Sequence, residues 1–457
     1  MTAALAGVAL PLAAWLLLRG GRGGSRWLAL DAAPALTLGL GLLAITARPL
    51  LSGALVAALL LGLLAVERAK RAALGEGLVF TDYALLPMVA RHPSLYLPFL
   101  PRGLLPAAVI GGALALVAML SLESTRAVPR LMLLGAACVL LLLLRRADLL
   151  ASPSGDPDTD AARFGPLATL ALHRAVAARE RPARQAALLP TPTPLSGVAP
   201  HLVLVQCESF CDPRRCAGIA AALPQWDRLG GEALLRGTLE VPGFGANTMR
   251  TEFAVLSGAP PAALGLDRFN PYARFARRPV HSLAHALEGH GALALHPFDR
   301  RFFGRHLVLP ALGFTRFDAA EAFAGAPRAG AHVADAALGA RIIAELRAAA
   351  APTFLFAITM QAHGPWTGED GQAQWLGHIA DTDRMLGAIA AAAADLELPL
   401  VLVAYGDHRP ALAALRDGQD TDYLIWRSDR AGHGTPHALD AHQLHAAILA
   451  AVAGEAG

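Results

Sequence analysis

Long apolar stretches dominate the first 150 residues of the chain. Five of them follow one another with short polar gaps, and each consists mostly of Leu, Ala, Val and Gly. A helix needs about 20 mostly apolar residues to cross a bilayer. We therefore predict an α-helical membrane domain with about five transmembrane helices, at 5–18, 27–44, 50–66, 104–122 and 131–144. A cleaved signal peptide is the alternative for 5–18, but the basic start typical of such a peptide is absent.

Two segments rich in Pro, Ser, Thr, Gly and Asp separate this region from the rest of the chain. They are ASPSGDPDTD, after Arg145 and Arg146, and LPTPTPLSGVAP, which ends before His201. Such segments bury little apolar surface and are typical of linkers. We predict a transmembrane domain over 1–147, a linker and juxtamembrane segment over 148–199, and a catalytic domain over 200–457.

Beyond residue 200 the pattern changes to short apolar runs that alternate with longer helical ones. This alternation predicts an α/β domain with a mostly parallel central sheet flanked by helices. We expect strands at 201–206, 292–296, 353–360, 398–406 and 422–427, and the clearest helix at 379–396.

Composition adds three points to this picture. A mean hydropathy of +0.43 with only 16% charged residues is too apolar for an ordinary soluble protein. The net charge of +3 comes from scattered Arg without a dense basic run, which argues against nucleic acid as a partner. Cys207, Cys211 and Cys216 lack paired C-x-x-C spacing, which argues against a zinc ribbon, although Cys211 and Cys216 could form a disulfide in an oxidising compartment.

Polar side chains follow four of the predicted strands. They are Glu208, His296, His363 and the pair Asp407-His408. A single Glu or His at a strand end is more often a cap or a solvated loop residue. The carboxyl ends of parallel strands meet at one edge of a sheet, however, so that these side chains are expected to lie together. Two carboxylates and an imidazole suit one divalent ion, and Mn²⁺, Mg²⁺ and Zn²⁺ all fit that set.

The segment VPGFGANTMRTEF contains a candidate nucleophile, Thr248. Glycines and Asn247 lead into an apolar helical pattern, which places Thr248 at or near the start of a helix. Its hydroxyl and the neighbouring N–H groups would face an incoming anion there. The plainer interpretation is that Asn247-Thr248 only caps the helix.

Taken together, these motifs resemble the lipoteichoic acid synthase and phosphoglycerol transferase family, a branch of the alkaline phosphatase and sulfatase superfamily. In that family a strand ends in Glu-Ser-Phe, and this chain has Glu208-Ser209-Phe210. The family's threonine nucleophile stands four residues before Glu-Phe, as Thr248 stands before Glu252-Phe253.

Three further motifs support the resemblance. His296 is followed seven and nine residues later by Phe303 and Arg305, where the relatives have Trp and Arg. His363 stands in QAHGPW, and Asp407-His408 closes the family's Tyr-Gly-Asp-His motif.

The resemblance implies a role for each of these residues. Glu208, Thr248, Asp407 and His408 would hold one divalent metal ion, with Mn²⁺ as the first choice and Mg²⁺ or Zn²⁺ as alternatives. Thr248 would become phosphorylated during the reaction, and His363 would protonate the leaving group or activate the acceptor. His296, Phe303, Arg305 and His363 would bind the substrate. The donor would be phosphatidylglycerol, and the acceptor a glycan or glycolipid.

Two other functions stay open. A phosphoethanolamine transferase of the same superfamily also combines five helices with a threonine nucleophile, and an inactive membrane sensor or scaffold could keep the fold. A formylglycine sulfatase is a weaker alternative. The run Cys211 to Arg215 fits C-x-P-x-R, but it follows Glu208 too closely and lacks the closing Thr-Gly.

The resemblance also implies a location. We expect a multi-pass protein of the bacterial inner (cytoplasmic) membrane whose catalytic domain is extracytoplasmic, in the periplasm. The basic loops disagree with this orientation, since RGGRGGSR, ERAKR and Arg145-Arg146 would lie outside, against the positive-inside tendency.

Overall fold

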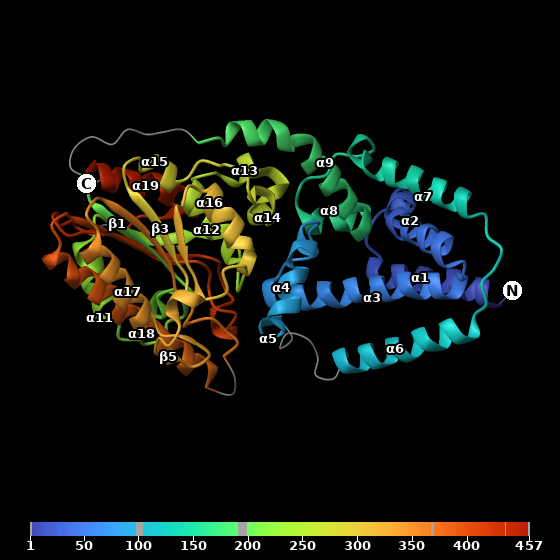
Figure 1. The fold of residues 1–457 in the computed structure, drawn as a ribbon, viewed down its shortest axis with the longest axis horizontal. Helices are drawn as coiled ribbons and strands as arrows, with labels where there is room; N and C mark the ends of the chain where they lie inside the picture. Colours follow the sequence, from blue (N-terminus) through green and yellow to red (C-terminus); the bar gives the residue numbers. More distant parts are fainter. Residues whose placement is uncertain (1, 97–103, 191–198, 367–369, 435, 456–457) are drawn as a thin grey trace. The chain divides into compact units, whose positions relative to one another are not determined.

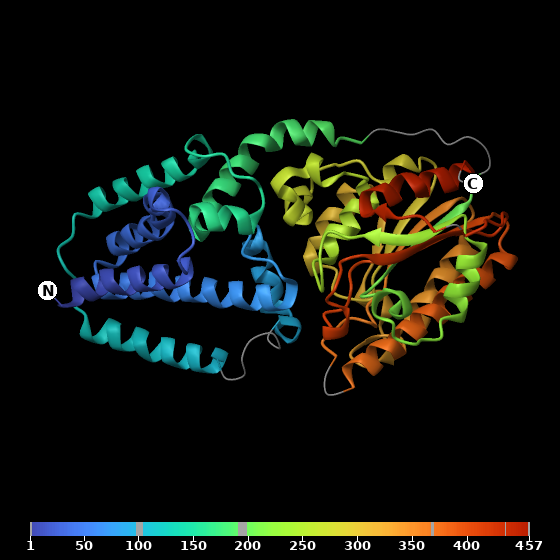
Figure 2. The same ribbon diagram turned by 180° about the vertical axis from the view of Figure 1, so that it is seen from behind.

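The computed structural model describes residues 2–96, 104–190, 199–366, 370–434 and 436–455. The chain forms two compact units, Met1–Pro182 and Ala183–Gly457 (Figures 1 and 2). The described secondary structure of the first is all helical, and the second is built on a central sheet.

All five predicted membrane stretches are helical. They fall in α1 (Thr2–Arg19), α2 (Leu28–Thr46), α3 (Pro49–Leu74), α6 (Leu104–Leu122) and α7 (Arg130–Leu144). Among the described residues, two segments are long and apolar enough to cross a membrane, Ser25–Thr46 and Pro49–Ala72. The other stretches are shorter apolar helices. The structure thus supports two candidate membrane spans. The other three predicted spans are, in their described part, helices too short to meet the same criterion.

A buried ion pair joins the helices of the first unit. Arg19, at the end of α1, donates to Asp31 of α2 at 2.8 Å, and both side chains are buried. Asp31 also accepts from the indole of Trp15 at 3.0 Å and from the backbone N–H of Ala168 at 2.9 Å. A charge inside an apolar helix is costly unless it is paired and hydrogen-bonded, and here each Asp31 oxygen has a partner.

The segment 148–199, predicted as a linker, is largely helical. It contains α8 (Pro157–Phe164) and α9 (Pro166–Ala187), while residues 191–198 of the second Pro-rich run lie outside the described residues. The first run contains a helix start that the linker interpretation overlooked. Asp156 caps α8 by accepting from the N–H of Thr159, and Pro157 occupies the first turn. Asp160 is then buried against His173 at 2.6 Å, which ties α8 to α9.

An eight-stranded sheet with the order β10-β2-β9-β8-β1-β7-β3-β4 forms the centre of the second unit. The five predicted strands are all present and correspond to β1 (His201–Cys207), β3 (Gly291–Leu295), β7 (Thr353–Ile358), β8 (Leu400–Gly406) and β9 (Thr421–Arg427). Pairing is parallel except around β9, which runs antiparallel to both β8 and β2. The prediction of a mostly parallel sheet is confirmed.

Three strands of the sheet were not predicted. They are β2 (Leu235–Glu240), β4 (Arg316–Asp318) and β10 (Leu439–Asp440). β2 contains Arg236, Gly237 and Glu240, and the other two strands are very short, so none of them shows an apolar run. β5 (Arg328–Ala329) and β6 (His332–Val333) form a separate two-stranded hairpin.

Helices cover both faces of the sheet (Figure 1). One face carries α11 (Pro224–Glu232), α17 (Asp335–Ala348) and α18 (Gly371–Ala392), which share a continuous apolar core with the strands. The other carries α12 (Thr248–Ser257), which packs on α19 (Ala441–Ala453). The predicted helix 379–396 lies in α18, which begins earlier and ends sooner.

Shorter helices connect these elements. In the second unit they are α10 (Pro213–Ala217), α13 (Pro261–Leu264), α14 (Pro271–Phe275), α15 (Leu283–Ala286) and α16 (Arg305–Ala311). In the first unit they are α4 (Leu86–Arg91) and α5 (Pro93–Tyr96).

The central strands are buried on both faces. Every residue of β1, β8 and β9 is buried, and burial of one Val, Leu, Ile or Phe side chain contributes about 1.5–3 kcal/mol. The buried apolar centre makes the sheet rigid. The polar residues that follow β1 and β8 are therefore held in fixed positions by the strands that precede them.

Candidate metal centre and active site

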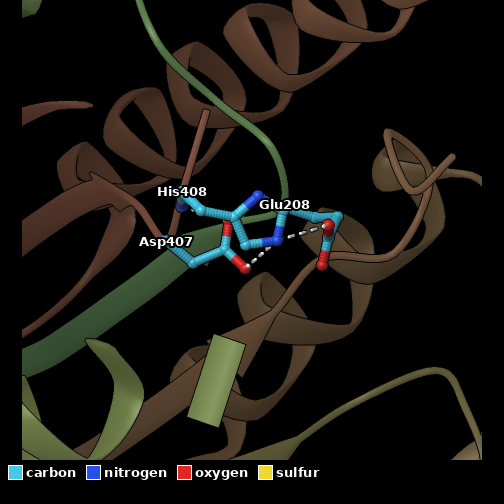
Figure 3. A group of neighbouring side chains, drawn as sticks. All are labelled: Glu208, Asp407 and His408. Atoms are coloured by element: carbon cyan, nitrogen blue, oxygen red, sulfur yellow. Dashed lines mark hydrogen bonds and ion pairs between the residues drawn. The ribbon is translucent and has the colours of Figure 1, made fainter. Parts of the chain in front are cut away.

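Three potential metal ligands meet where β1 and β8 end (Figure 3). Glu208, Asp407 and His408 each offer one ligand atom, and these atoms lie within 4.8 Å of one another. The Nε2 atom of His408 is 3.5 Å from Oε1 of Glu208 and 3.4 Å from Oδ2 of Asp407. All three side chains are buried. The structure thus brings together three of the four metal ligands expected from the sequence.

The register of the two strands explains this meeting. β1 and β8 pair in parallel with Cys207 opposite Gly406, so that Glu208 and Asp407 follow at the same level of the sheet. The backbone N–H of Ser209, which has a φ of 51°, donates to Oδ1 of Asp407 at 2.8 Å. The N–H of Glu208 donates to the hydroxyl of Thr359 at 2.8 Å. Backbone contacts therefore set the positions of both carboxylates.

His408 is oriented as a ligand. Its Nδ1 lies 3.0 Å from the carbonyl oxygen of Arg409 and donates to it when protonated, which leaves the lone pair of Nε2 facing the two carboxylates. Burial lowers the pKa of His408, but the charges of Asp407 and Glu208 outweigh it, and the pKa is raised overall. The contact of Nδ1 with the Arg409 carbonyl leaves Nε2 as the nitrogen that faces the two carboxylates, and a bound cation would take the place of the proton that they favour on it.

Asp407 is the most constrained carboxylate of the group. Burial first, and then the charge of Glu208, raise the pKa of Asp407 to about 7. Its Oδ1 accepts from the N–H groups of Ser209 and His408, whereas its Oδ2 has no hydrogen-bond partner among the described residues. A buried oxygen without a partner is costly. A cation at this point would satisfy Oδ2 and offset the repulsion between the carboxylates.

Thr248 is the first residue of α12, as the sequence predicted. Asn247 before it adopts the left-handed conformation, with a φ of 67°, which Asn tolerates better than most residues, and its side chain makes no capping hydrogen bond. The capping interpretation is therefore not supported. Against the larger effects of burial and Glu208, a side-chain hydrogen bond with Thr248 lowers the pKa of Asp407, and the hydroxyl of Thr251 donates to the Asp407 carbonyl at 2.7 Å. The nucleophile candidate thus lies against the metal-ligand group.

Arg305 and His296 form one buried unit. Nη1 of Arg305 lies 3.1 Å from Nε2 of His296, and its Nε and Nη2 donate to the Glu252 carboxylate at 3.0 and 2.6 Å. Burial and the Arg305 cation lower the pKa of His296 well below its ordinary value, so the imidazole is neutral. Phe303 is half-buried and lies 5.5 Å from the Arg305 guanidinium, measured to its ring centroid. These residues are together, but Arg305 is already engaged by Glu252.

His363 lies beside a histidine that the sequence analysis missed. The rings of His363 and His332 are 5.9 Å apart between centroids, and His332 stands on the β5–β6 hairpin. Burial, followed by the neighbouring His363, lowers the pKa of His332 to about 4, and the charge of Glu208 acts on it in the opposite sense. A two-residue strand leaves no recognisable pattern in the sequence, so nothing there pointed to His332.

The cysteines take no part in this site. Cys211 is fully buried and Cys216 half-buried, and both are free thiols. The hydrogen bond with Cys216 and burial raise the pKa of Cys211 well above its ordinary value. The side chain that lies against Asp407 is thus that of Thr248, not that of the cysteine in the sulfatase-like run.

Comparison with known proteins places this geometry in a family. The family model described as Sulfatase matches residues 200–454, more than half of the chain. The chain belongs to the sulfatase family. The membership of the alkaline phosphatase and sulfatase superfamily that the motifs indicated is therefore confirmed, and the sheet and the metal-ligand group lie inside the matched region of this sulfatase domain.

Individual relatives cover parts of the chain. The capsular polysaccharide biosynthesis protein RkpI of Rhizobium meliloti (strain 1021) is 36% identical over 243 residues, which are 50% of this chain and 45% of RkpI. The chain thus matches less than half the length of this curated relative. Among solved structures, the Streptococcus pyogenes phosphoglycerol transferase GacH, in complex with sn-glycerol-1-phosphate, is 19% identical, with a TM-score of 0.49 and coverage of 60% of this chain and 80% of that one. The lipoteichoic acid synthase LtaP from Listeria monocytogenes is 16% identical, with a TM-score of 0.45 and coverage of 57% and 76%.

The residues of the sulfatase domain fit a divalent metal ion, as used in this superfamily. Two carboxylates and one imidazole nitrogen form a mixed oxygen and nitrogen donor set. Oδ2 of Asp407 has no hydrogen-bond partner in the described part of the chain, and Nε2 of His408 faces it at 3.4 Å. Which ion is bound stays a prediction.

Metal binding should therefore stabilise the protein. With Mn²⁺ at a free concentration of about 100 times its Kd, the free energy of unfolding should rise by about 2.7 kcal/mol. Thermal unfolding of the detergent-solubilised chain with EDTA and then with excess Mn²⁺, Mg²⁺ or Zn²⁺ measures this rise. A melting temperature that no ion changes would contradict the metal assignment.

Proposed function

We propose that the chain is a membrane-anchored phosphotransferase that moves a phosphoglycerol group from phosphatidylglycerol to a glycan or glycolipid acceptor. The observation that carries this proposal is the position of Thr248, whose hydroxyl acts on Asp407 at the start of α12, beside Glu208 and His408. A hydroxyl placed beside a metal-ligand group is suited to attack on phosphorus rather than to a structural role.

Glu208, Asp407, His408 and Thr248 would hold the divalent ion. When bound, such an ion lowers the pKa of a coordinated hydroxyl and offsets charge on a phosphoryl oxygen. The Thr248 hydroxyl would give its proton to solvent as its Oγ forms a bond to phosphorus, while the bond from phosphorus to the diacylglycerol oxygen breaks and protonated His363 gives its proton to that oxygen. Neutral His363 would then take the proton of an acceptor hydroxyl as the acceptor oxygen bonds to phosphorus. The bond from phosphorus to Oγ breaks in this second step, and the released Thr248 oxygen regains a proton from solvent.

The choice of phosphoglycerol rests on the resemblance of His296, Phe303 and Arg305 to the family motif. The neutral imidazole of His296 and the half-buried ring of Phe303 are both uncharged groups, and both lie next to the Arg305 cation. A cation flanked by uncharged groups suits a polyol head group better than a head group that carries its own positive charge. Phosphoethanolamine carries a cationic amine, so its transfer is the second candidate.

The first unit supports a membrane location. In its described part, two helices are long and apolar enough to span, and the five spans expected from the sequence stay part of the proposal. We place the catalytic domain outside the cytoplasm, where a lipid donor in the same membrane and a glycan acceptor would both be reached. The likeness to RkpI, named for capsular polysaccharide biosynthesis, supports a glycan as the acceptor.

Release of diacylglycerol tests the donor. The purified, detergent-solubilised chain is incubated with Mn²⁺ and fluorescent phosphatidylglycerol or, separately, fluorescent phosphatidylethanolamine. We expect release from phosphatidylglycerol only. Release from phosphatidylethanolamine alone would replace the proposal by phosphoethanolamine transfer, and release from neither lipid would favour the inactive scaffold or another donor.

A further inference from the structure

Glu252 is the centre of a buried polar network beneath the site. It is fully buried and accepts hydrogen bonds from Arg305, from the hydroxyl of Tyr272 and, at 3.2 Å, from Nε2 of Gln206. Gln206 in turn accepts from the hydroxyl of Tyr405 at 2.5 Å. Burial and the charge of Glu252 raise the pKa of Tyr272 well above its ordinary value, so the phenol keeps its proton and donates. Every member of this network is fixed by another.

The network connects the elements that carry the chemistry. Gln206 and Tyr405 pair across β1 and β8 and stand two residues before Glu208 and Asp407. Glu252 stands four residues after Thr248 on α12, and residues at this spacing share one helix face. The Glu252 carboxylate is therefore held at a set distance from the nucleophile and from the metal-ligand group.

Arg305 has donors to spare after binding Glu252. A guanidinium has five N–H donors in a fixed plane, and Glu252 and His296 take three of them. Burial lowers the pKa of Arg305, but Glu252 outweighs it and the pKa is raised, so the group stays a cation. The charge of Glu208 also contributes to the raised pKa of Arg305. The two other N–H donors have no partner among the described residues and are available to an anion.

We propose that Glu252 is a positioning residue, which holds the Arg305 plane so that its two remaining donors bind a phosphate oxygen of the substrate. The same carboxylate acts on His296 through Arg305. Nη1 of Arg305 donates to Nε2 of His296, so the imidazole proton is on Nδ1, which lies 3.4 Å from the carbonyl oxygen of Ile358. This inference rests on the proposed function only in that the bound anion belongs to a phospholipid donor.

The direction in which Glu252→Gln changes the Kd for phosphate distinguishes a positioning role of Glu252 from a purely electrostatic one. Glu252→Gln removes a negative charge near the anion site, so Coulomb attraction alone predicts tighter phosphate binding. If Glu252 orients Arg305, the variant should instead bind inorganic phosphate about tenfold more weakly, as for other supporting residues of a site. Isothermal titration of the Mn²⁺-loaded full chain with inorganic phosphate measures the Kd. Binding as tight as in the wild type, or tighter, would overturn the proposal, as would an absence of saturable binding to the wild type.

A double-mutant cycle tests whether Glu252 acts through Arg305. Arg305→Gln and the double variant E252Q/R305Q should have equal Kd values, since a residue acting only through another adds nothing once that other is gone. An additional loss in the double variant would contradict the proposal. Tyr272→Phe is the matched control, because it removes a hydrogen bond from the same carboxylate without touching the Arg305 fork, and its Kd should change less than about threefold.

Folding and donor identity are controlled separately. Removing one member of a buried pair destabilises a protein more than removing both, so E252Q is compared with the neutral double variant by thermal unfolding. If E252Q does not fold, Arg305→Lys replaces it, since lysine keeps the charge without the planar fork. A wild-type Kd in Arg305→Lys would overturn the proposal. Phosphate binding does not depend on the lipid head group, so a failure of phosphatidylglycerol turnover alone would affect the proposed function and leave this inference standing.

Discussion

Thr248→Ala should lower diacylglycerol release from phosphatidylglycerol by on the order of a thousandfold or more, which is the effect expected when a nucleophile is removed. Thr248 lies at the start of α12, and its side chain acts on the pKa of Asp407. Two other hydroxyls nearby are already engaged, since that of Ser209 donates to Oε1 of Glu208 at 2.9 Å and that of Thr251 donates to the backbone carbonyl of Asp407 at 2.7 Å. Lipid with a ³²P-labelled phosphate should label the wild-type chain covalently and leave the alanine variant unlabelled.

Thr248→Ser is the matched control for this loss. Serine keeps the hydroxyl at the same place on the helix, so turnover and labelling should both persist at a reduced level. Metal-dependent stabilisation should be largely retained in the alanine variant, because the three ligands Glu208, Asp407 and His408 are untouched. Turnover that survives in Thr248→Ala would exclude the phospho-threonine pathway and turn attention to direct transfer.

Asp407→Asn should give the second large effect. An amide binds a cation far less well than a carboxylate does, so metal affinity should fall by on the order of a hundredfold or more and turnover with it. Without metal, however, the variant should melt at a higher temperature than the wild type. The cause is that burial and the charge of Glu208 raise the pKa of Asp407 to about 7, which shows that its charge is unfavourable in the metal-free fold.

Opposite changes in affinity and stability are the distinguishing result for Asp407. Metal titration and thermal unfolding with EDTA measure the two quantities on one preparation. Asp383→Asn serves as a comparison, since Asp383 is also buried but accepts from the backbone N–H of Trp226 at 2.6 Å, away from the metal-ligand group. It should leave metal affinity unchanged. Unchanged metal affinity in Asp407→Asn would contradict the site.

The sequence alone located the central strands and their polar ends. β1, β8 and β9 are buried on both faces, so each is a continuous apolar run, and a polar residue after such a run stands at the sheet edge. Glu208, Asp407 and His408 were found in this way and lie together. Thr248 was found because glycines and Asn247 precede an apolar helical pattern. These features are local, and local patterns are readable from one chain.

The tertiary structure decided what depends on distant partners. β2 is a strand because it pairs with β9, and β10 because it pairs with β2. The composition of these two segments does not predict a strand. Helices α8 and α9 formed where a linker was predicted, since Asp160 finds a buried partner in His173. The sequence suggested Arg305 as a substrate ligand, but only the fold showed that Glu252, 53 residues away, engages it first. His332 joins the site from a two-residue strand. Hydrophobic periodicity indicates which residues are buried. Polar partners are brought together by the fold from distant positions in the chain, so the local sequence pattern does not indicate them.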